Sequence, residues 1–169
     1  MKLDLASLKE MHPLLPAVTA ADRAHCAAVG LGRHGHTPGV AMTATLDTGE
    51  HQTVLDWAVA PAEHAAQLDP HRVTEDAAEA VSLALVNVAR GWVVRRRLAR
   101  GEAADWLLAD PEHRLIALEV SGIDRGAIAT RLKEKLRQAA GATAAPRRVA
   151  SVVELATPQT VLAAVGSGP

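Results

Sequence analysis

Two acidic residues of this chain stand in short apolar segments, at positions where apolar side chains would be expected. Asp105 opens the segment 105–108 (DWLL), and Glu119 lies near the end of the segment 115–120 (LIALEV). The residues between them, 110–113 (DPEH), suit a turn, because the fixed φ of proline fits its second position. The pattern therefore predicts a β-hairpin in which residue 107 lies opposite 117 and Asp105 lies opposite Glu119.

This pairing of acids points to a metal ion. Directly opposed residues on one face of a hairpin have Cβ atoms roughly 4.5–5.5 Å apart. Two carboxylates at that separation repel each other unless a cation lies between them, and a divalent metal is the usual cation. We therefore predict a metal site at Asp105 and Glu119. The alternative is that both are solvated strand residues, or that they form salt bridges to Arg97, Arg100 or Arg114.

Length, composition and charge limit the class of protein. The 169 residues are enough for a buried core, and we expect residues 1–169 to form a single domain. Three Trp, with no Phe and no Tyr, leave Ala, Val and Leu to fill that core. The net charge of −1 argues against a general polyanion-binding surface, since such proteins usually carry a basic excess, but it leaves room for a local basic patch.

The cysteine content and the apolar runs bear on the compartment. With the single Cys26 there is no internal disulfide, which is typical of a reducing compartment. No apolar run approaches the roughly 18 residues needed to span a bilayer, and residues 1–12 (MKLDLASLKEMH) lack the core of a signal peptide. We expect a cytoplasmic protein that does not enter a membrane.

The secondary-structure pattern predicts an α/β (α+β) fold, with a mixed central β-sheet flanked by helices. Residues 17–60 are expected to form an N-terminal helix and a β-hairpin. Thr74 suits the N-cap of the longest helix, and Gly91 is expected to bend or end it, with residues 92–100 continuing as a second helical segment. The expected elements are helix 18–29, strands 40–46 and 51–59, helix 74–99, the acidic hairpin, helix 125–140, strand 149–155 and a short helix from Thr157-Pro158.

Residues 74–155, about half of the chain, resemble the PD-(D/E)XK nuclease superfamily. The resemblance lies in a capped helix that carries Glu, a Gly-x-x-x-Asp motif, an apolar hairpin, a Glu-x-x triplet, a second helix and an apolar strand. It implies a restriction-endonuclease-like fold and a nuclease-like core at 74–155. It also implies hydrolysis of phosphodiester bonds in DNA with Mg²⁺, because that reaction needs a metal-bound nucleophile and neutralised oxygens.

The acids of the motif carry over onto this chain residue by residue. Asp105 matches the first acid of the superfamily and Glu119 the second, while Glu79 is chosen for the acid on the preceding helix. Glu75, one turn earlier on the same helix face, is held in reserve. The superfamily has three strands between its two helices, and the pattern here shows two. The resemblance therefore implies Glu79, Asp105 and Glu119 as metal ligands.

The lysine of the motif does not carry over, because the triplet is Glu119-Val120-Ser121. Ser121 is neutral and cannot replace an ammonium group electrostatically. Lys133 or Lys135, on the next helix, would have to supply the cation. With them, the implied catalytic residues are Asp105, Glu119, Lys133 and Lys135.

Partners follow from the same reasoning. A basic cluster after Trp92 could contact DNA phosphates, or it could be the positive last turn of a long helix. The other function for this fold is a catalytically silent binding or accessory subunit with a protein partner, in which Ser121 marks lost catalysis. A looser alternative is a small α/β interaction protein with surface acids. The basic cluster consists of Arg95, Arg96, Arg97 and Arg100.

A zinc site is a weaker interpretation of four residues near the N-terminus. His25, Cys26, His34 and His36 are the right residue types, but their spacing matches no common zinc pattern. His25 and Cys26 are adjacent on a predicted helix and so point about 100° apart. Cys26 is expected to be a small core residue, and His34 and His36 to lie in a surface loop.

Overall fold

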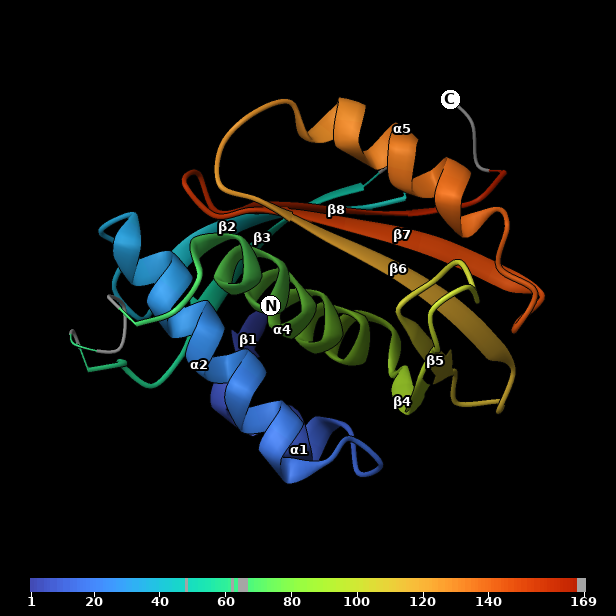
Figure 1. Cartoon of the computed structure of the whole chain (residues 1–169), viewed down its shortest axis with the longest axis horizontal. Helices are drawn as coiled ribbons and strands as arrows, with labels where there is room; N and C mark the ends of the chain where they lie inside the picture. Colours follow the sequence, from blue (N-terminus) through green and yellow to red (C-terminus); the bar gives the residue numbers. More distant parts are fainter. Residues whose placement is uncertain (48, 62, 64–66, 167–169) are drawn as a thin grey trace.

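The computed structural model describes all residues except 48, 62, 64–66 and 167–169 (Figure 1). In this part of the chain, eight strands form one mixed sheet in the order β1-β3-β2-β8-β7-β6-β5-β4. The strands are β1 (Lys2–Asp4), β2 (Val40–Leu46), β3 (Gly49–Asp56), β4 (Val93–Arg97), β5 (Trp106–Ala109), β6 (Leu115–Ile123), β7 (Arg147–Glu154) and β8 (Gln159–Ala164). The helices are η1 (Leu5–Ser7), α1 (Leu8–Met11), α2 (Ala17–Arg33), α4 (Pro70–Arg90) and α5 (Ile128–Ala139).

The expected mixed sheet flanked by helices is confirmed. Helices α2 and α4 pack together and lie on one face of the sheet, and α5 covers part of the other face (Figure 1). The crossover from β6 through α5 to β7 joins two parallel strands. Within the described residues, none of the helices has the length and apolar character needed to cross a bilayer.

Helix α4 is the centre of the core. Nearly every residue from Val73 to Val86 is buried, because α2 covers one side of the helix and the sheet covers the other. Alanines supply much of this surface, and their small side chains allow close packing in a chain that has no Phe or Tyr. A helix that is buried on almost all sides is a rigid platform for any polar side chain that it carries.

The boundaries of α4 correct two expectations. The N-cap is Asp69, whose carboxylate accepts a hydrogen bond from the backbone N–H of Arg72 at 2.9 Å, and not Thr74. The helix ends at Arg90, because Gly91 adopts a left-handed conformation with φ of 67°. The expected helical continuation over 92–100 is wrong, since Val93–Arg97 form the edge strand β4.

As a consequence, three strands and not two lie between α4 and α5. The expectation of a final helix after Thr157-Pro158 is also wrong, because residues 159–164 form β8 between β7 and β2. In both places the local pattern allowed a helix, and pairing with other strands decided otherwise: β4 pairs with β5, and β8 pairs with β7 and β2. The acidic hairpin has the predicted register, with Leu107 opposite Ala117.

His12 links the N-terminal segment to α4 and β4, and it provides a test of this packing. The backbone N–H of Val94 donates to Nδ1 of His12 at 3.2 Å, so the ring proton lies on Nε2, which donates to the carbonyl of Leu83 at 3.1 Å. The ring is fully buried, and this burial lowers the pKa of His12 below its ordinary value. A protonated ring would also lose the bond from Val94.

We therefore expect acid to destabilise the protein through His12. Below about pH 6.5 the His12 ring is protonated in the unfolded chain but not in the native state. The free energy of unfolding therefore falls as pH falls below that value. Urea unfolding at pH 7.5 and 5.5 should show the advantage of the wild type over His12→Gln shrinking by about 1 kcal/mol. Subtracting the variant cancels the titration of other groups. If the wild type and His12→Gln differed in free energy of unfolding by the same amount at both pH values, a neutral buried His12 would not be the cause.

Candidate functional site

The sequence-predicted acids lie where β5 and β6 separate. The two strands pair as far as Leu118, and β6 then continues without β5. Two carboxylates accept hydrogen bonds from the part of β6 that β5 leaves unpaired. Val120 N–H donates to Oδ2 of Asp105 at 2.8 Å, and Gly122 N–H donates to Oε2 of Glu75 at 3.1 Å. These two hydrogen bonds from the unpaired backbone of β6 hold the carboxylates of Asp105 and Glu75 in place.

Glu119 is the most enclosed acid of the site, with 1% of its surface exposed. Its Oε1 lies 2.6 Å from Nζ of Lys135, which reaches it from α5. Its Oε2 is buried and has no hydrogen-bond partner among the described residues. Burial, and then the neighbouring carboxylate of Asp105, raise the pKa of Glu119 to about 7, while Lys135 acts in the opposite direction. This pair of acids therefore requires a proton or a cation.

Of the two predicted lysines, the structure brings Lys135 to the acids and not Lys133. Lys133 is exposed, and residues two apart on a helix point about 200° away from each other. Ser121, at the lysine position of the motif, is fully buried and accepts a hydrogen bond from Nε of Arg131 at 2.9 Å. Its hydroxyl lies 3.4 Å from Oε1 of Glu75. The hydroxyl of Ser121 thus links Glu75, the acid held in reserve, to the guanidinium group of Arg131 on α5.

Glu79 is held by two arginines. The carboxylate is 6% exposed, and Nε of Arg23 lies 2.6 Å from its Oε2. Nη1 and Nη2 of Arg97 reach Oε2 and Oε1 at 3.2 and 3.0 Å. Both oxygens of Glu79 therefore accept hydrogen bonds from guanidinium groups. Its role as a metal ligand stays a prediction.

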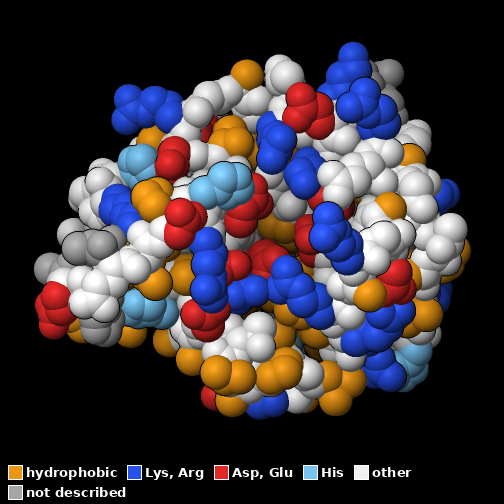
Figure 2. Space-filling model, viewed as in Figure 1, with side chains coloured by type: hydrophobic (Ala, Val, Ile, Leu, Met, Phe, Trp, Pro, Cys, Tyr) orange, Lys and Arg blue, Asp and Glu red, His pale blue; other side chains and the backbone are white. Residues whose placement is uncertain are grey.

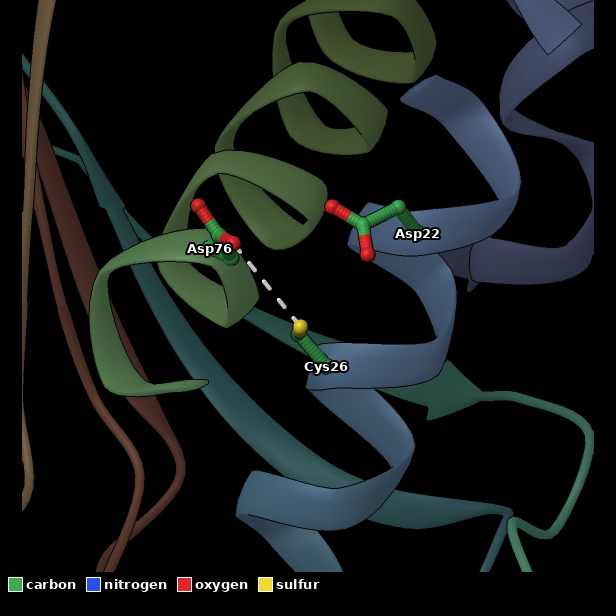
Figure 3. Close-up of side chains that lie close together, drawn as sticks. All are labelled: Asp22, Cys26 and Asp76. Carbon is green, nitrogen blue, oxygen red and sulfur yellow. Dashed lines mark hydrogen bonds between the residues drawn. The ribbon is translucent and has the colours of Figure 1, made fainter. Parts of the chain in front are cut away.

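In the described part of the chain, the group of potential ligands with atoms within 4.8 Å of one another is Asp22, Cys26 and Asp76, not the predicted set of acids. Figure 3 shows these three side chains facing one another between α2 and α4. Arg23 and Arg72 each contact both carboxylates, at 2.7 to 3.2 Å.

These contacts make the group an ion-pair network. The charges of Asp22 and Asp76 are already balanced by the arginines, and the thiol of Cys26 lies 3.8 Å from Asp76. Burial, reinforced by Asp76, raises the pKa of Cys26 to about 11, which disfavours the thiolate that a metal would need. The predicted core position of Cys26 is confirmed.

The other residues weighed for zinc do not meet at one point. His34 lies 3.3 Å from Asp124, and His36 contacts the carbonyl groups of Leu155 and Ala156. Cys26 lies instead at the contact between α2 and α4. His34 and His36 therefore connect the end of α2 to the residues that follow β6 and β7.

A hollow of about 500 Å³ opens beside the acids, between the loop that joins β4 to β5 and the end of α5. Figure 2 shows acidic side chains recessed in the middle of the visible face, with Lys and Arg side chains around them. The polar and charged residues that line the hollow are Arg97, Arg100, Asp105, Glu119 and Gln138.

The basic cluster predicted to contact DNA is divided by the structure. Arg97 and Arg100 line the hollow, whereas Arg96 forms two hydrogen bonds to Glu102 at 2.8 and 3.0 Å. Arg95 is exposed on the edge strand. The alternative explanation for this cluster, the last turn of a helix, is wrong because these residues follow the end of α4.

Two residues of the site, Arg23 and Arg131, were not predicted from the sequence. Arg23 lies on the buried face of α2 with Ala20 and Ala27, and a charged residue on an apolar stripe was the signal that could have revealed it. Arg131 gave no comparable signal, because α5 is polar and only Ala139 is buried in it. Its place beside Ser121 depends on how α5 lies across the sheet.

Comparisons of the chain with protein-family models, with curated proteins and with solved structures found no match. Architecture alone does not assign an activity, since unrelated functions share folds. The function therefore has to be inferred from the chemistry of this site.

Proposed function

We propose that this chain hydrolyses phosphodiester bonds of DNA with a divalent metal ion, Mg²⁺ in the first place, held by Asp105 and Glu119. The observation that carries the proposal is the 2.6 Å contact between Nζ of Lys135 and Oε1 of Glu119. It puts an ammonium group beside the two acids, although Ser121 occupies the lysine position of the motif. The order α4-β4-β5-β6-α5-β7 lends support, since the resemblance to PD-(D/E)XK nucleases calls for three strands between two helices.

The donor set fits such a metal. Mg²⁺ prefers carboxylate oxygens and binds through one or two carboxylates together with substrate phosphates. Asp105 and Glu119 supply two carboxylates, and Oε2 of Glu119 is a buried acceptor without a partner in the described part of the chain. When bound, the metal would lower the pKa of a water molecule and polarise the phosphate.

The protein groups have distinct tasks in this proposal. The hydrogen bond from Val120 fixes Asp105, so its carboxylate does not have to be ordered when substrate arrives. Lys135 favours the ionised form of Glu119, and its remaining N–H groups can stabilise negative charge that develops on the phosphate. The hollow admits a phosphate to acids that are otherwise enclosed.

Cleavage of supercoiled plasmid in Mg²⁺ or Mn²⁺ tests the proposal. We expect the wild type to nick the plasmid and Asp105→Asn and Glu119→Gln to lose more than about 100-fold in rate, because even residues that only orient metal ligands typically cost 10–100-fold. Asn can still accept the hydrogen bond from Val120, so the fold is retained. Glu50→Gln, at an exposed position of β3, is the matched control. Equal rates in all four proteins would contradict the proposal.

A second candidate is the silent binding or accessory subunit. It is favoured by Glu79, whose oxygens are occupied by two guanidinium groups, and by Ser121, whose hydroxyl is engaged by Arg131. For this candidate we expect the wild type to leave the plasmid intact with both metals. Isothermal titration of Mn²⁺ would then show no difference between the wild type and Asp105→Asn.

A further inference from the structure

We infer that Arg97 binds the substrate phosphate in the hollow and that Glu79 acts by holding Arg97 in position. The identity of the substrate rests on the proposed function, whereas the anion-binding role rests on the contacts of Arg97 itself. These contacts involve Glu79, Trp106 and the wall of the hollow.

The guanidinium group of Arg97 is fixed on two sides. Its Nη1 and Nη2 bond to the two oxygens of Glu79, and its Cζ lies 5.1 Å from the centre of the Trp106 ring. About half of the side chain, 49%, remains exposed where it lines the hollow with Asp105 and Glu119. A guanidinium group has five N–H donors, so the pair with Glu79 leaves three for a ligand.

Arg97 can attract an anion through its exposed side. Its partner Glu79 is shared with Arg23, whose Nε lies 2.6 Å from it. Arg23 in turn pairs with Asp22 and Asp76. Arg23 is buried with its partners, whereas Arg97 faces the hollow. A planar guanidinium fork matches the oxygens of a phosphate, which makes arginine the favoured residue for this contact.

The hollow itself indicates a ligand independently of Arg97. Oε2 of Glu119 is buried there without a hydrogen-bond partner among the described residues, which is costly unless a ligand or a proton shared with Asp105 satisfies it. A phosphate with its metal would satisfy Glu119 on one side and Arg97 on the other. Arg100 also lines the hollow, but it is exposed and, among the described residues, has no comparable support from a buried acid and a ring.

Preorganisation distinguishes Arg97 from the rest of the basic cluster. A flexible arginine loses side-chain freedom when it binds, and a fixed one does not. Arg96 is fixed as well, but by Glu102, which is only partly buried. Arg97 is therefore held by a carboxylate of α4, the buried helix that also carries Glu75.

Binding of a fluorescein-labelled 20-nucleotide DNA in EDTA tests the inference without any cleavage. We expect Arg97→Gln to weaken binding about tenfold and Arg97→Lys to recover part of the loss. The slope of log K against log salt should fall by about one in Arg97→Gln, an effect that a purely structural role would not produce. Arg90→Gln makes the same change in net charge at the C-terminal end of α4, where Arg90 pairs with Asp47 outside the hollow, and should bind like the wild type.

Kinetics in Mn²⁺ test the role of Glu79. We expect Glu79→Gln to lower kcat and to raise KM less than Arg97→Gln does, because the charge of Arg97 stays while its fixed position is lost. Mn²⁺ affinity measured by isothermal titration should match the wild type; a large loss would make Glu79 a metal ligand and overturn its positioning role. Unchanged DNA binding in Arg97→Gln would overturn the inference even if the wild type cleaves DNA. Binding that depends on Arg97 in a protein that cleaves nothing would support it and refute the proposed nuclease.

Discussion

Lys135→Met is expected to lower the free energy of unfolding by about 3 kcal/mol at pH 8 and by much less at pH 5. The reason is Glu119, which is almost fully buried and has Lys135 as its cationic partner at 2.6 Å. Removing one member of a buried ion pair leaves the other charge uncompensated. At pH 5 the carboxyl group can hold a proton, so the variant then buries a neutral group.

The sign follows from the pKa of Glu119. Its native pKa of about 7 lies above the value near 4.5 in the unfolded chain, so ionisation costs stability as pH rises from about 4.5 through 7. Without Lys135, which lowers that pKa, the cost becomes larger and extends to higher pH. Urea unfolding at the two pH values measures the effect.

Two controls separate this cause from general loss of packing. The double variant Lys135→Met/Glu119→Gln should lose the extra dependence on pH, because no carboxyl group remains to titrate at this position. Lys133→Met, on the exposed side of the same helix, should change stability by less than about 0.5 kcal/mol. An equal loss at pH 5 and pH 8 in Lys135→Met would show that the ion pair is not the cause.

Gly122→Ala is expected to destabilise the protein by about 3 kcal/mol or more. A Cβ atom at position 122 would lie 2.2 Å from the carbonyl oxygen of Thr74 and 2.7 Å from its carbonyl carbon. Both are backbone atoms of α4, so no change of rotamer relieves the clash. The helix would have to move away from β6 and carry Glu75, which binds the N–H of Gly122, with it.

Thermal unfolding measures this effect, and a loss of that size corresponds to roughly 10 °C in a protein of this length. The matched control is Gly32→Ala in α2, where a Cβ would meet no heavy atom within 4 Å. That change should stabilise the protein by up to about 1 kcal/mol, because alanine is the better helix former. If both variants were tolerated equally, α4 would not lie in contact with the backbone of β6.

The acidic hairpin is the part of the site that sequence alone placed correctly. Its turn at 110–113 and its two apolar segments are close in the chain, so local preferences determine the register that puts Leu107 opposite Ala117. The end of α4 at Gly91 is encoded in the same way. By contrast, residues 92–100 and 157–164 have patterns that suit a helix, and the strands β4 and β8 form there because partner strands are available.

Sequence by itself therefore determined the residue types of the site, the register of the acidic hairpin as far as Leu118, and the general layering of helices on a mixed sheet. Tertiary structure alone decided that Lys135 and not Lys133 meets Glu119, and that Arg23 and Arg97 hold Glu79. The physical reason is distance along the chain. A turn or a helix end depends on neighbouring residues, whereas the phase of α5 over the sheet and the approach of α2 to α4 depend on packing among segments that are far apart in sequence.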